Sequence, residues 1–124
     1  MTEPASSLDP IAAYGAAWLE TEAGRRLELL DVAWQPEAVY CDPLDVVAGR
    51  EALSAHIAAT QAGLRGGRVA VTSEPVRHHD AAFFRWTMTD AAGATVMTGF
   101  DVVQLAADGR IARLTGFFDS DTAR

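Results

Sequence analysis

The chain has 124 residues, of which 49% are hydrophobic and 22% are charged, and these proportions are typical of a soluble globular domain. Its formal net charge of −7 and its pI of about 4.7 exclude the usual binders of nucleic acids or anionic membranes. No apolar run approaches the roughly 20 residues that cross a bilayer. Residues 1–7 also lack the basic and apolar segments of a secretory signal. We therefore expect a cytoplasmic protein with one domain over residues 1–124.

The first predicted helix begins at Asp9-Pro10, because Asp can cap the free amides and Pro is well tolerated at the first helical position. From there Ile11, Tyr14 and Trp18 recur at helical spacing and form one apolar stripe. This stripe predicts a helix that packs on the core.

Two more helices are predicted before the strands begin. The second starts at Thr21-Glu22, keeps its helical spacing as far as Trp34 and ends at Pro36. After a short strand at 38–41 and an Asp42-Pro43 turn, the third covers residues 49–60.

The second half of the chain reads as strands. Turn sequences that end in Gly93 and Gly109 separate long runs of strand-forming residues. The predicted strands are 68–74, 81–89, 95–105 and 111–118, with a short piece at 76–78. Helices followed by strands indicate an α+β domain, with the helices packed on a curved, mostly antiparallel sheet around one pocket.

Alternation along one predicted strand places an acidic residue on an apolar face, where acids are rare. In the strand 95–105, Asp101 shares a face with Met97, Gly99 and Val103. Burying a carboxyl group on an apolar face is costly unless the group is neutral or hydrogen-bonded. Asp101 is therefore a candidate for a role inside a pocket, with a partly exposed sheet edge as the ordinary alternative.

Several short segments carry a resemblance to a known family. They are Trp34-Gln35-Pro36-Glu37-Ala38-Val39-Tyr40, Asp42-Pro43, Gly49-Arg50-Glu51-Ala52-Leu53 and Asp108-Gly109-Arg110-Ile111 leading to Gly116-Phe117-Phe118. In their order and spacing the chain resembles the NTF2-like (SnoaL-like) superfamily from about residue 11 to residue 118. This resemblance implies a cone, in which a strongly curved sheet and three N-terminal helices enclose one pocket, and it implies a homodimer.

Three positions are also similar to those of the ketosteroid isomerases. Tyr14 matches an oxyanion-hole tyrosine, Asp42 matches a general-base aspartate that precedes a proline, and Asp101 matches a protonated aspartic acid. Each has an ordinary alternative: Asp42 can simply form the turn with Pro43, and Tyr14 can simply pack in the core.

If the helix and strand faces that carry these three residues converge, they form an aromatic, apolar pocket. We expect this pocket to bind a small apolar molecule. The substrate-binding residues that we expect are Trp18, Tyr40, His56, Phe84, Trp86, Met88 and Phe118. His56 is also an alternative base, although a lone histidine on such a helix face is more often a core residue. The adjacent pair His78-His79 is a poor chelate, so no metal and no cofactor are expected.

These residues would suit a cofactor-free acid–base enzyme that moves a proton next to a carbonyl group, as an isomerase does. The alternatives are an epoxide hydrolase, a polyketide-cyclase type of enzyme, and a non-catalytic binding or dimerisation module. Val96, Phe100 and Val102 point outward from the sheet, so a second copy of the chain is the expected partner there. Arg85 is expected to face outward too, where it could pair an acid across the dimer interface.

Overall fold

The computed structural model describes residues 4–119. A short 3-10 turn at Ala5–Ser7 precedes the first helix. The helices are α1 (Pro10–Leu19), α2 (Ala23–Ala33) and α3 (Arg50–Leu64). The strands are β1 (Trp34–Cys41), β2 (Val46–Ala48), β3 (Arg68–Val71), β4 (Val76–His78), β5 (Ala81–Thr89), β6 (Thr95–Leu105) and β7 (Ile111–Phe118).

Acidic side chains begin the first two helices. Oδ1 of Asp9 accepts a hydrogen bond from the amide of Ala12 at 2.9 Å, and Pro10 is the first residue of α1, as the sequence predicted. At α2 the cap is Glu22, whose carboxylate accepts from the amides of Gly24 and Arg25. A carboxylate here also interacts favourably with the positive end of the helix dipole.

The predicted end of α2 was wrong. The helix stops at Ala33, and Trp34 and Pro36 belong to β1. Trp34 is fully buried, and its indole N–H donates to the carbonyl of Ala38 at 3.1 Å, which holds this stretch extended. Pro36 is tolerated because the pairing of β1 with β7 is irregular between Trp34 and Val39, so no ladder hydrogen bond from Pro36 is required.

Two other boundaries and one additional strand also differ from the prediction. The third helix continues past Thr60 to Leu64, and β3 ends at Val71 instead of Glu74. Strand β2 was not predicted, because its three residues directly follow the turn and are too few to show a period.

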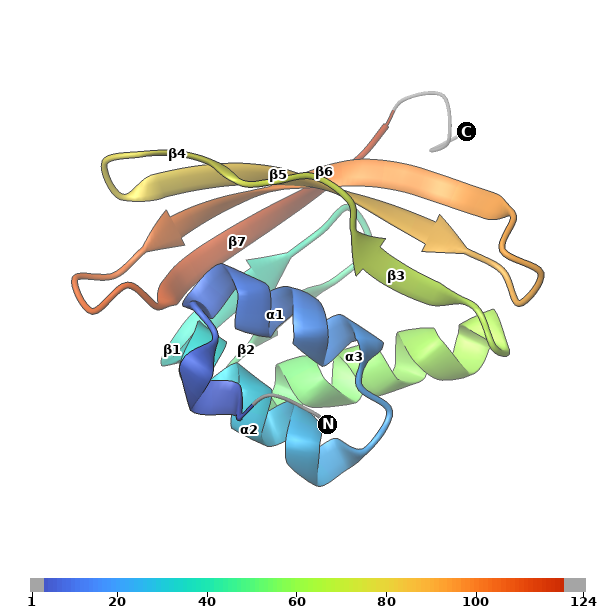
Figure 1. Ribbon diagram of the computed structural model, residues 1–124, viewed down its shortest axis with the longest axis horizontal. Coiled ribbons are helices and arrows are strands. Elements are labelled where there is room, and N and C mark those ends of the chain that lie inside the picture. Colours follow the sequence, from blue (N-terminus) through green and yellow to red (C-terminus); the bar gives the residue numbers. More distant parts are fainter. Residues whose placement is uncertain (1–3, 120–124) are drawn as a thin grey trace.

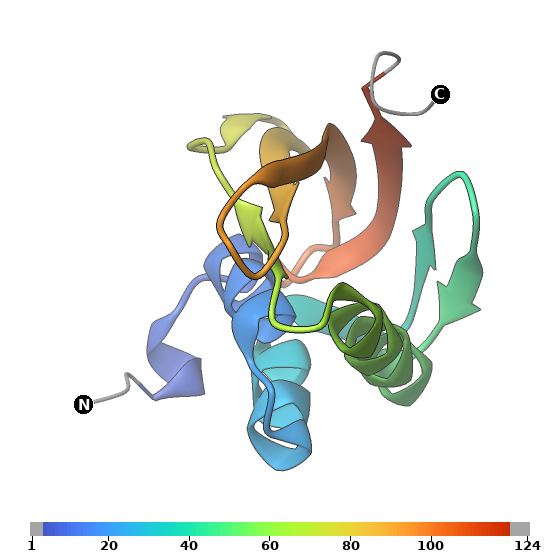
Figure 2. The same ribbon diagram turned by 90° about the vertical axis from the view of Figure 1, so that its right-hand side faces the viewer.

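The sheet has the strand order β2-β1-β7-β6-β5-β3, with β4 paired to β5 outside this path. Only the β1–β7 pair is parallel, which confirms a mostly antiparallel sheet. All three helices lie on one side of the sheet in Figure 1, and the strands curl around that side in Figure 2. This arrangement confirms the expected cone-shaped α+β fold.

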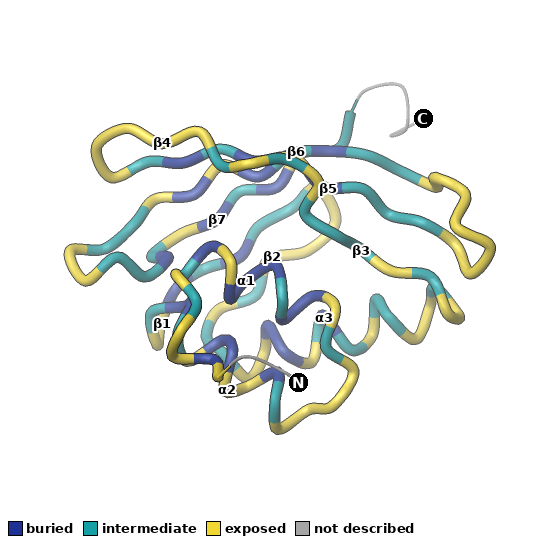
Figure 3. The backbone as a smooth tube through the Cα atoms, in the orientation of Figure 1, coloured by how far each residue is buried: buried dark blue, intermediate teal, exposed yellow. Residues whose placement is uncertain are grey.

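The buried part of the backbone faces the layer between helices and sheet (Figure 3). Tyr14 of α1 lies at its centre, where its ring stacks on Trp34 at 5.8 Å between centroids and meets Phe84 at 6.1 Å. Within the described residues, no helix is long and apolar enough to span a membrane.

A buried polar network joins the three helices. Arg26, only 3% exposed, donates from Nε to the carbonyl of Glu20 and from its two terminal nitrogens to Ser54 Oγ and Gln61 Oε1. Gln61 in turn donates to the carbonyl of Trp18 at the end of α1. This network fixes α1, which carries two pocket residues, against α2 and α3.

Candidate active site

An open pocket of about 160 Å³ lies between the helices and the concave face of the sheet. Its lining includes nine of the ten residues that the sequence nominated: Tyr14, Trp18, Tyr40, Asp42, His56, Trp86, Met88, Asp101 and Phe118. The fold therefore brings together side chains from α1, α3, β1, β5, β6 and β7, together with Asp42 just beyond the end of β1.

Phe84 was wrongly placed in this lining. It lies on the same face of β5 as Trp86 and Met88, but it is fully buried and packs against the ring of Tyr14. Strand alternation predicts the face of the sheet on which a residue lies, but it does not predict how deeply that residue is buried below the pocket. Phe84 therefore supports the floor of the pocket from below.

Seven lining residues were not predicted as site residues: Leu44, Asp45, Thr60, Val69, Val71, Met97 and Gly116. Met97 and Gly116 could have been found, because they share strand faces with Asp101 and Phe118. Leu44 and Asp45 lie in the turn after Pro43, where no periodicity reveals the direction of a side chain.

Tyr14 forms the floor of the pocket. It is 2% exposed, and stacking against Trp34 holds its ring in place. Burial raises the pKa of the Tyr14 hydroxyl well above its usual value, and the nearby carboxyl of Asp101 raises it further, while a hydrogen bond with the Trp18 side chain acts in the opposite direction. The phenol is therefore held in its neutral form, in which it can donate a hydrogen bond.

Asp101 is the second buried polar group of the pocket. It is 6% exposed and pairs across the sheet with Phe84 on β5 and Gly116 on β7. Burial raises the pKa of Asp101 to about 8; a hydrogen bond from Trp86 lowers it somewhat, and Asp42 adds to the rise. At pH 7 Asp101 is thus mostly a neutral carboxylic acid, which can donate a hydrogen bond.

Two glycines make room for these groups. A methyl group on Gly116 would lie 2.9 Å from Oδ1 of Asp101 and 3.6 Å from Cβ of Asp42. A methyl group on Gly99 would lie 2.3 Å from the indole ring of Trp86. Trp86 can therefore lie over the sheet beside Asp101 only because Gly99 has no side chain.

Asp42 combines the two roles that the sequence left open. Its Oδ1 accepts hydrogen bonds from the amides of Leu44 and Asp45 at 2.8 and 2.9 Å, which makes it the turn-forming residue. Its Oδ2 accepts from the hydroxyl of Tyr40 at 2.6 Å. Three donors are therefore directed at this one carboxyl group, whose two oxygens act as acceptors.

Tyr40 therefore orients Asp42 within the pocket. Burial raises the pKa of the Tyr40 hydroxyl far above its usual value, and its hydrogen bond to Asp42 adds to this effect. The hydroxyl keeps its proton and donates it to the carboxylate. The Tyr40 ring also packs against His56, with 4.9 Å between the centroids.

His56 lies between two acids at the mouth of the pocket. Its Nε2 is 3.8 Å from Oδ2 of Asp42, and its Nδ1 is 4.0 Å from Oδ2 of Asp45. The side chains of His56 and Asp42 are 14% and 10% exposed, whereas that of Asp45 is 53% exposed. The two ring nitrogens thus face Asp42 on one side and the solvent-facing Asp45 on the other.

The same three residues form the one cluster of possible metal ligands within residues 4–119, with donor atoms no more than 4.8 Å apart. The sequence had suggested no metal ligands here, because Asp42 and Asp45 flank a turn whereas His56 lies on α3. Asp42 faces Nε2 of His56, whereas Asp45 faces Nδ1. A metal ion would bind only one of these two ring nitrogens.

The expected histidine turn lies away from this site. His78 ends β4, and His79 has a positive φ of 52°, which makes it part of the turn to β5. Their Nδ1 atoms are 3.3 Å apart on the exposed surface. Cys41, at the end of β1, is a half-buried free thiol.

Comparison with known proteins places the chain in a family. The sequence pattern of the SnoaL-like domain matches residues 16–114. A crystal structure named for a proposed isomerase of the SnoaL-like family, from Agrobacterium tumefaciens strain C58, is 34% identical; the match covers 89% of this chain and 94% of that one, with a TM-score of 0.82. No curated protein matches the chain significantly.

More distant structures share the fold. A proposed polyketide cyclase from Sinorhizobium meliloti is 22% identical over 90% of this chain and 97% of its own, with a TM-score of 0.67. An NTF2-like protein of unknown function from Exiguobacterium sp. 255-15 is 18% identical over 90% of this chain and 98% of its own, with a TM-score of 0.68. The chain shares its fold with NTF2-like proteins and belongs to the SnoaL-like family.

Proposed function

We propose that the protein is an acid–base enzyme that moves a proton next to the carbonyl group of a small apolar molecule. The observation that supports this proposal is a pair of acids in opposite environments. Asp42 accepts three hydrogen bonds, whereas Asp101 is buried and keeps its proton. A carboxylate held by hydrogen-bond donors suits the role of base, and a buried neutral acid suits the role of hydrogen-bond donor.

In the proposed step, Oδ2 of Asp42 takes a proton from the carbon next to the carbonyl group. The C–H bond breaks, an O–H bond forms on Asp42, and the electron pair moves to the carbonyl oxygen. Tyr14 and neutral Asp101 donate hydrogen bonds to this developing oxyanion. Asp42 then returns the proton to another carbon of the enolate. Alternatively the proton leaves to solvent through His56, and a solvent proton returns by the same route to the carbon.

The names of similar structures agree with this chemistry at the level of reaction class. One is a proposed isomerase and another a proposed polyketide cyclase. Isomerisation of a ketone and its aldol cyclisation both begin with removal of a proton next to a carbonyl group. Proton abstraction is therefore the step that an assay should measure.

Deuterium exchange measures this step before the natural substrate is known. Acetophenone, whose methyl protons lie next to its carbonyl group, would be incubated in D2O with the protein, and loss of the methyl signal followed by proton NMR. Wild type is expected to exchange well above the buffer rate, and Asp42→Asn at or near it. Glu37→Gln, which removes an equal charge from an exposed position on β1, is the control. Equal exchange by wild type and Asp42→Asn would contradict the proposal.

The epoxide-hydrolase alternative uses the same pair of acids. Asp42 would activate water, and neutral Asp101 would protonate the epoxide oxygen. Styrene oxide has nearly the same size as acetophenone. Hydrolysis of styrene oxide without exchange of acetophenone would favour this alternative, whereas binding of both without any turnover would favour a non-catalytic binding module.

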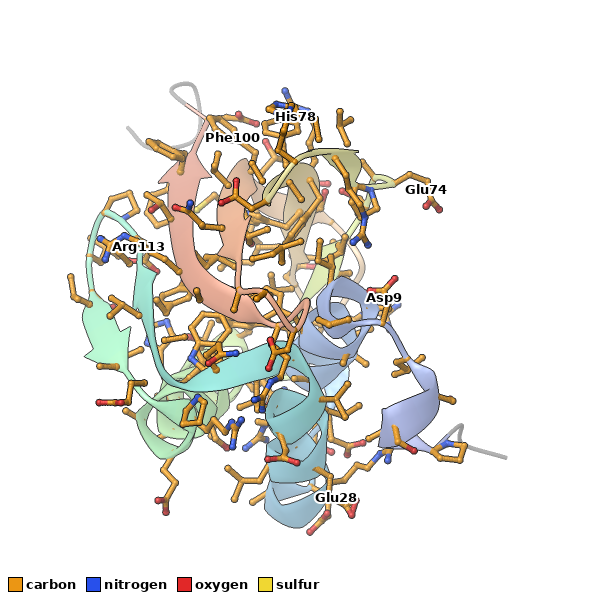
Figure 4. The ribbon with its side chains drawn as sticks, turned by 90° about the vertical axis from the view of Figure 1, so that its left-hand side faces the viewer. Asp9, Glu28, Glu74, His78, Phe100 and Arg113 are labelled. Carbon is orange, nitrogen blue, oxygen red and sulfur yellow. The ribbon has the colours of Figure 1, made fainter. Side chains whose placement is uncertain are left out.

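We also propose that the outer face of the sheet joins two copies of the chain. Phe100 of β6 lies on the side away from the helices in Figure 4, stacked on Phe117 at 4.9 Å and near Phe83 at 5.3 Å. Val96, Val102 and Phe117 are 41–48% exposed there. An apolar sheet face of this kind is typical of an interface.

Arg85 faces outward as predicted, over the rings of Phe83 and Phe100, but it pairs with Asp119 of the same chain at 3.7 Å. Sedimentation is expected to give a dimer for wild type and a monomer for Phe117→Glu. A wild-type monomer at micromolar concentration would contradict the dimer proposal.

A further inference from the structure

The volume of the pocket limits what it can hold. A cavity of about 160 Å³ is close to the roughly 150 Å³ of an engineered apolar cavity that binds benzene. One six-membered ring with a short substituent fills such a space. Because the pocket is open, the second ring of a fused two-ring molecule would have to extend out through its mouth, and a four-ring molecule would extend farther.

Packed aromatic rings fix the two side walls. On one side Trp86 and Phe118 meet edge to face at 6.0 Å between centroids. On the other side the ring of Tyr40 packs against Trp18 at 6.3 Å, and its hydroxyl is bound to Asp42. Since these rings support one another, the walls cannot simply move apart for a larger ligand.

Two methionines provide the adjustable part of the lining. Met88 of β5 and Met97 of β6 are direct partners in the register of the sheet, and both contact the pocket. Methionine is unbranched and fills irregular space. Truncating either side chain should therefore enlarge the pocket without disturbing the acids or the aromatic walls.

The charges around the pocket select against anions. Among the described residues that line it are three aspartates, Asp42, Asp45 and Asp101, and no lysine or arginine. A bound carboxylate or phosphate would face the Asp42 and Asp45 carboxylates with only His56 as a possible cation. Burying a negative charge without a fixed counter-charge is costly.

The deep end of the pocket selects for a hydrogen-bond acceptor. Tyr14 and Asp101 both offer a donor there. A protonated amine brings only donors, so it leaves these groups unmatched, whereas a carbonyl oxygen accepts from both. Leu44, which is 77% exposed, lies at the other end with Asp45 and forms an apolar rim.

We infer that the pocket selects an uncharged carbonyl compound of about one ring, and that it rejects carboxylates and two-ring compounds of the same chemistry. The inference rests on the proposed function for the direction of the carbonyl group, toward Tyr14 and Asp101. Binding and turnover are separate measurements, so the two proposals can fail independently.

Three compounds test this selectivity by binding alone: acetophenone, benzoate and 2-acetylnaphthalene. The indole signals of Trp18 and Trp86, which line the pocket, would be followed by nitrogen–proton NMR. Trp34, whose indole N–H is buried on the carbonyl of Ala38 outside the lining, is an internal control. Acetophenone is expected to shift the first two signals and leave that of Trp34 unchanged.

Benzoate and 2-acetylnaphthalene are expected to bind wild type at least about ten-fold more weakly than acetophenone. Charge repulsion opposes the binding of benzoate, and the small volume of the pocket opposes the binding of 2-acetylnaphthalene. Met88→Ala should improve binding of 2-acetylnaphthalene several-fold. Asp45→Asn should improve binding of benzoate several-fold, and Glu37→Gln should not. Equal affinity of wild type for all three compounds would overturn the inference.

The outcomes separate this inference from the proposed function. If acetophenone binds selectively but its methyl protons do not exchange, the enzyme proposal fails and the selectivity stands. If the protons exchange while benzoate or 2-acetylnaphthalene binds equally well, the selectivity fails and the enzyme proposal stands.

Discussion

Asp42 and Asp101 flank a single glycine. Gly116 lies between them on β7, so close that a methyl group there would be 2.9 Å from Oδ1 of Asp101 and 3.6 Å from Cβ of Asp42. The acids are separated by 59 positions in the sequence, yet they line one pocket, where their local surroundings differ. Asp42 accepts three hydrogen bonds near the mouth of the pocket, whereas Asp101 is buried and holds its proton.

The raised pKa of Asp101 predicts that stability falls with pH. The folded protein keeps the Asp101 proton up to about pH 8, whereas the unfolded chain releases it near the ordinary value of 3.8. Between these values unfolding releases a proton, so the free energy of unfolding decreases as the pH rises, by at most about 1.4 kcal/mol per unit.

Urea unfolding of wild type and Asp101→Asn at several pH values measures this effect. The variant cannot ionise at this position, so its stability relative to wild type should increase steadily from pH 5 to pH 8. A constant difference between the two proteins over that range would show that Asp101 is not a buried neutral acid.

Alanine substitutions at two glycines are predicted to change the stability of the protein in opposite directions. One glycine is required by close packing, whereas the other only lowers helix propensity. Gly99→Ala should destabilise the protein by about 2 kcal/mol or more, because the methyl group meets the Trp86 indole at 2.3 Å and the Phe117 carbonyl oxygen. Gly63→Ala on α3 meets nothing within 4 Å and should stabilise it by about 0.5–1 kcal/mol. Thermal unfolding of both variants checks the prediction, and similar shifts of Tm in one direction would contradict it.

Removing the Arg26 side chain is predicted to loosen the packing of the helices. Arg26→Ala leaves Ser54 Oγ and Gln61 Oε1 without the donor that Arg26 provides, at a cost of about 2–4 kcal/mol in the free energy of unfolding. Arg113→Ala, at an exposed position on β7, should change it by less than about 0.5 kcal/mol. Denaturant unfolding of the two variants provides the comparison, and equal losses would show that the network is not stabilising.

Tyr14→Phe is predicted to lower the rate of acetophenone exchange by about 100-fold, because it removes one of two donors to the oxyanion. The ring keeps its stacking on Trp34, so thermal stability should stay close to that of wild type. Exchange that is unchanged in this variant would remove Tyr14 from the mechanism and leave it as a packing residue.

Much of this fold follows from local patterns. The cap at Asp9, the hairpin glycines and the alternation of β6 predicted their elements because each depends on neighbouring residues alone. Trp34 and Pro36 misled the prediction of α2, because tertiary contacts of Trp34 override its helical spacing. Likewise Asp45 joins the site through a turn and His56 through a helix, and only the folded chain brings them together.

The protonation of Asp101 is the most direct test of the account. Its carboxyl carbon can be followed by NMR between pH 4 and pH 10 in the ligand-free protein, with Asp101→Asn to assign the signal. The structure predicts a pKa of about 8, caused mainly by burial. A value near 4 would show that Asp101 is ionised at neutral pH, and the proposed hydrogen-bond donor to the oxyanion would be lost.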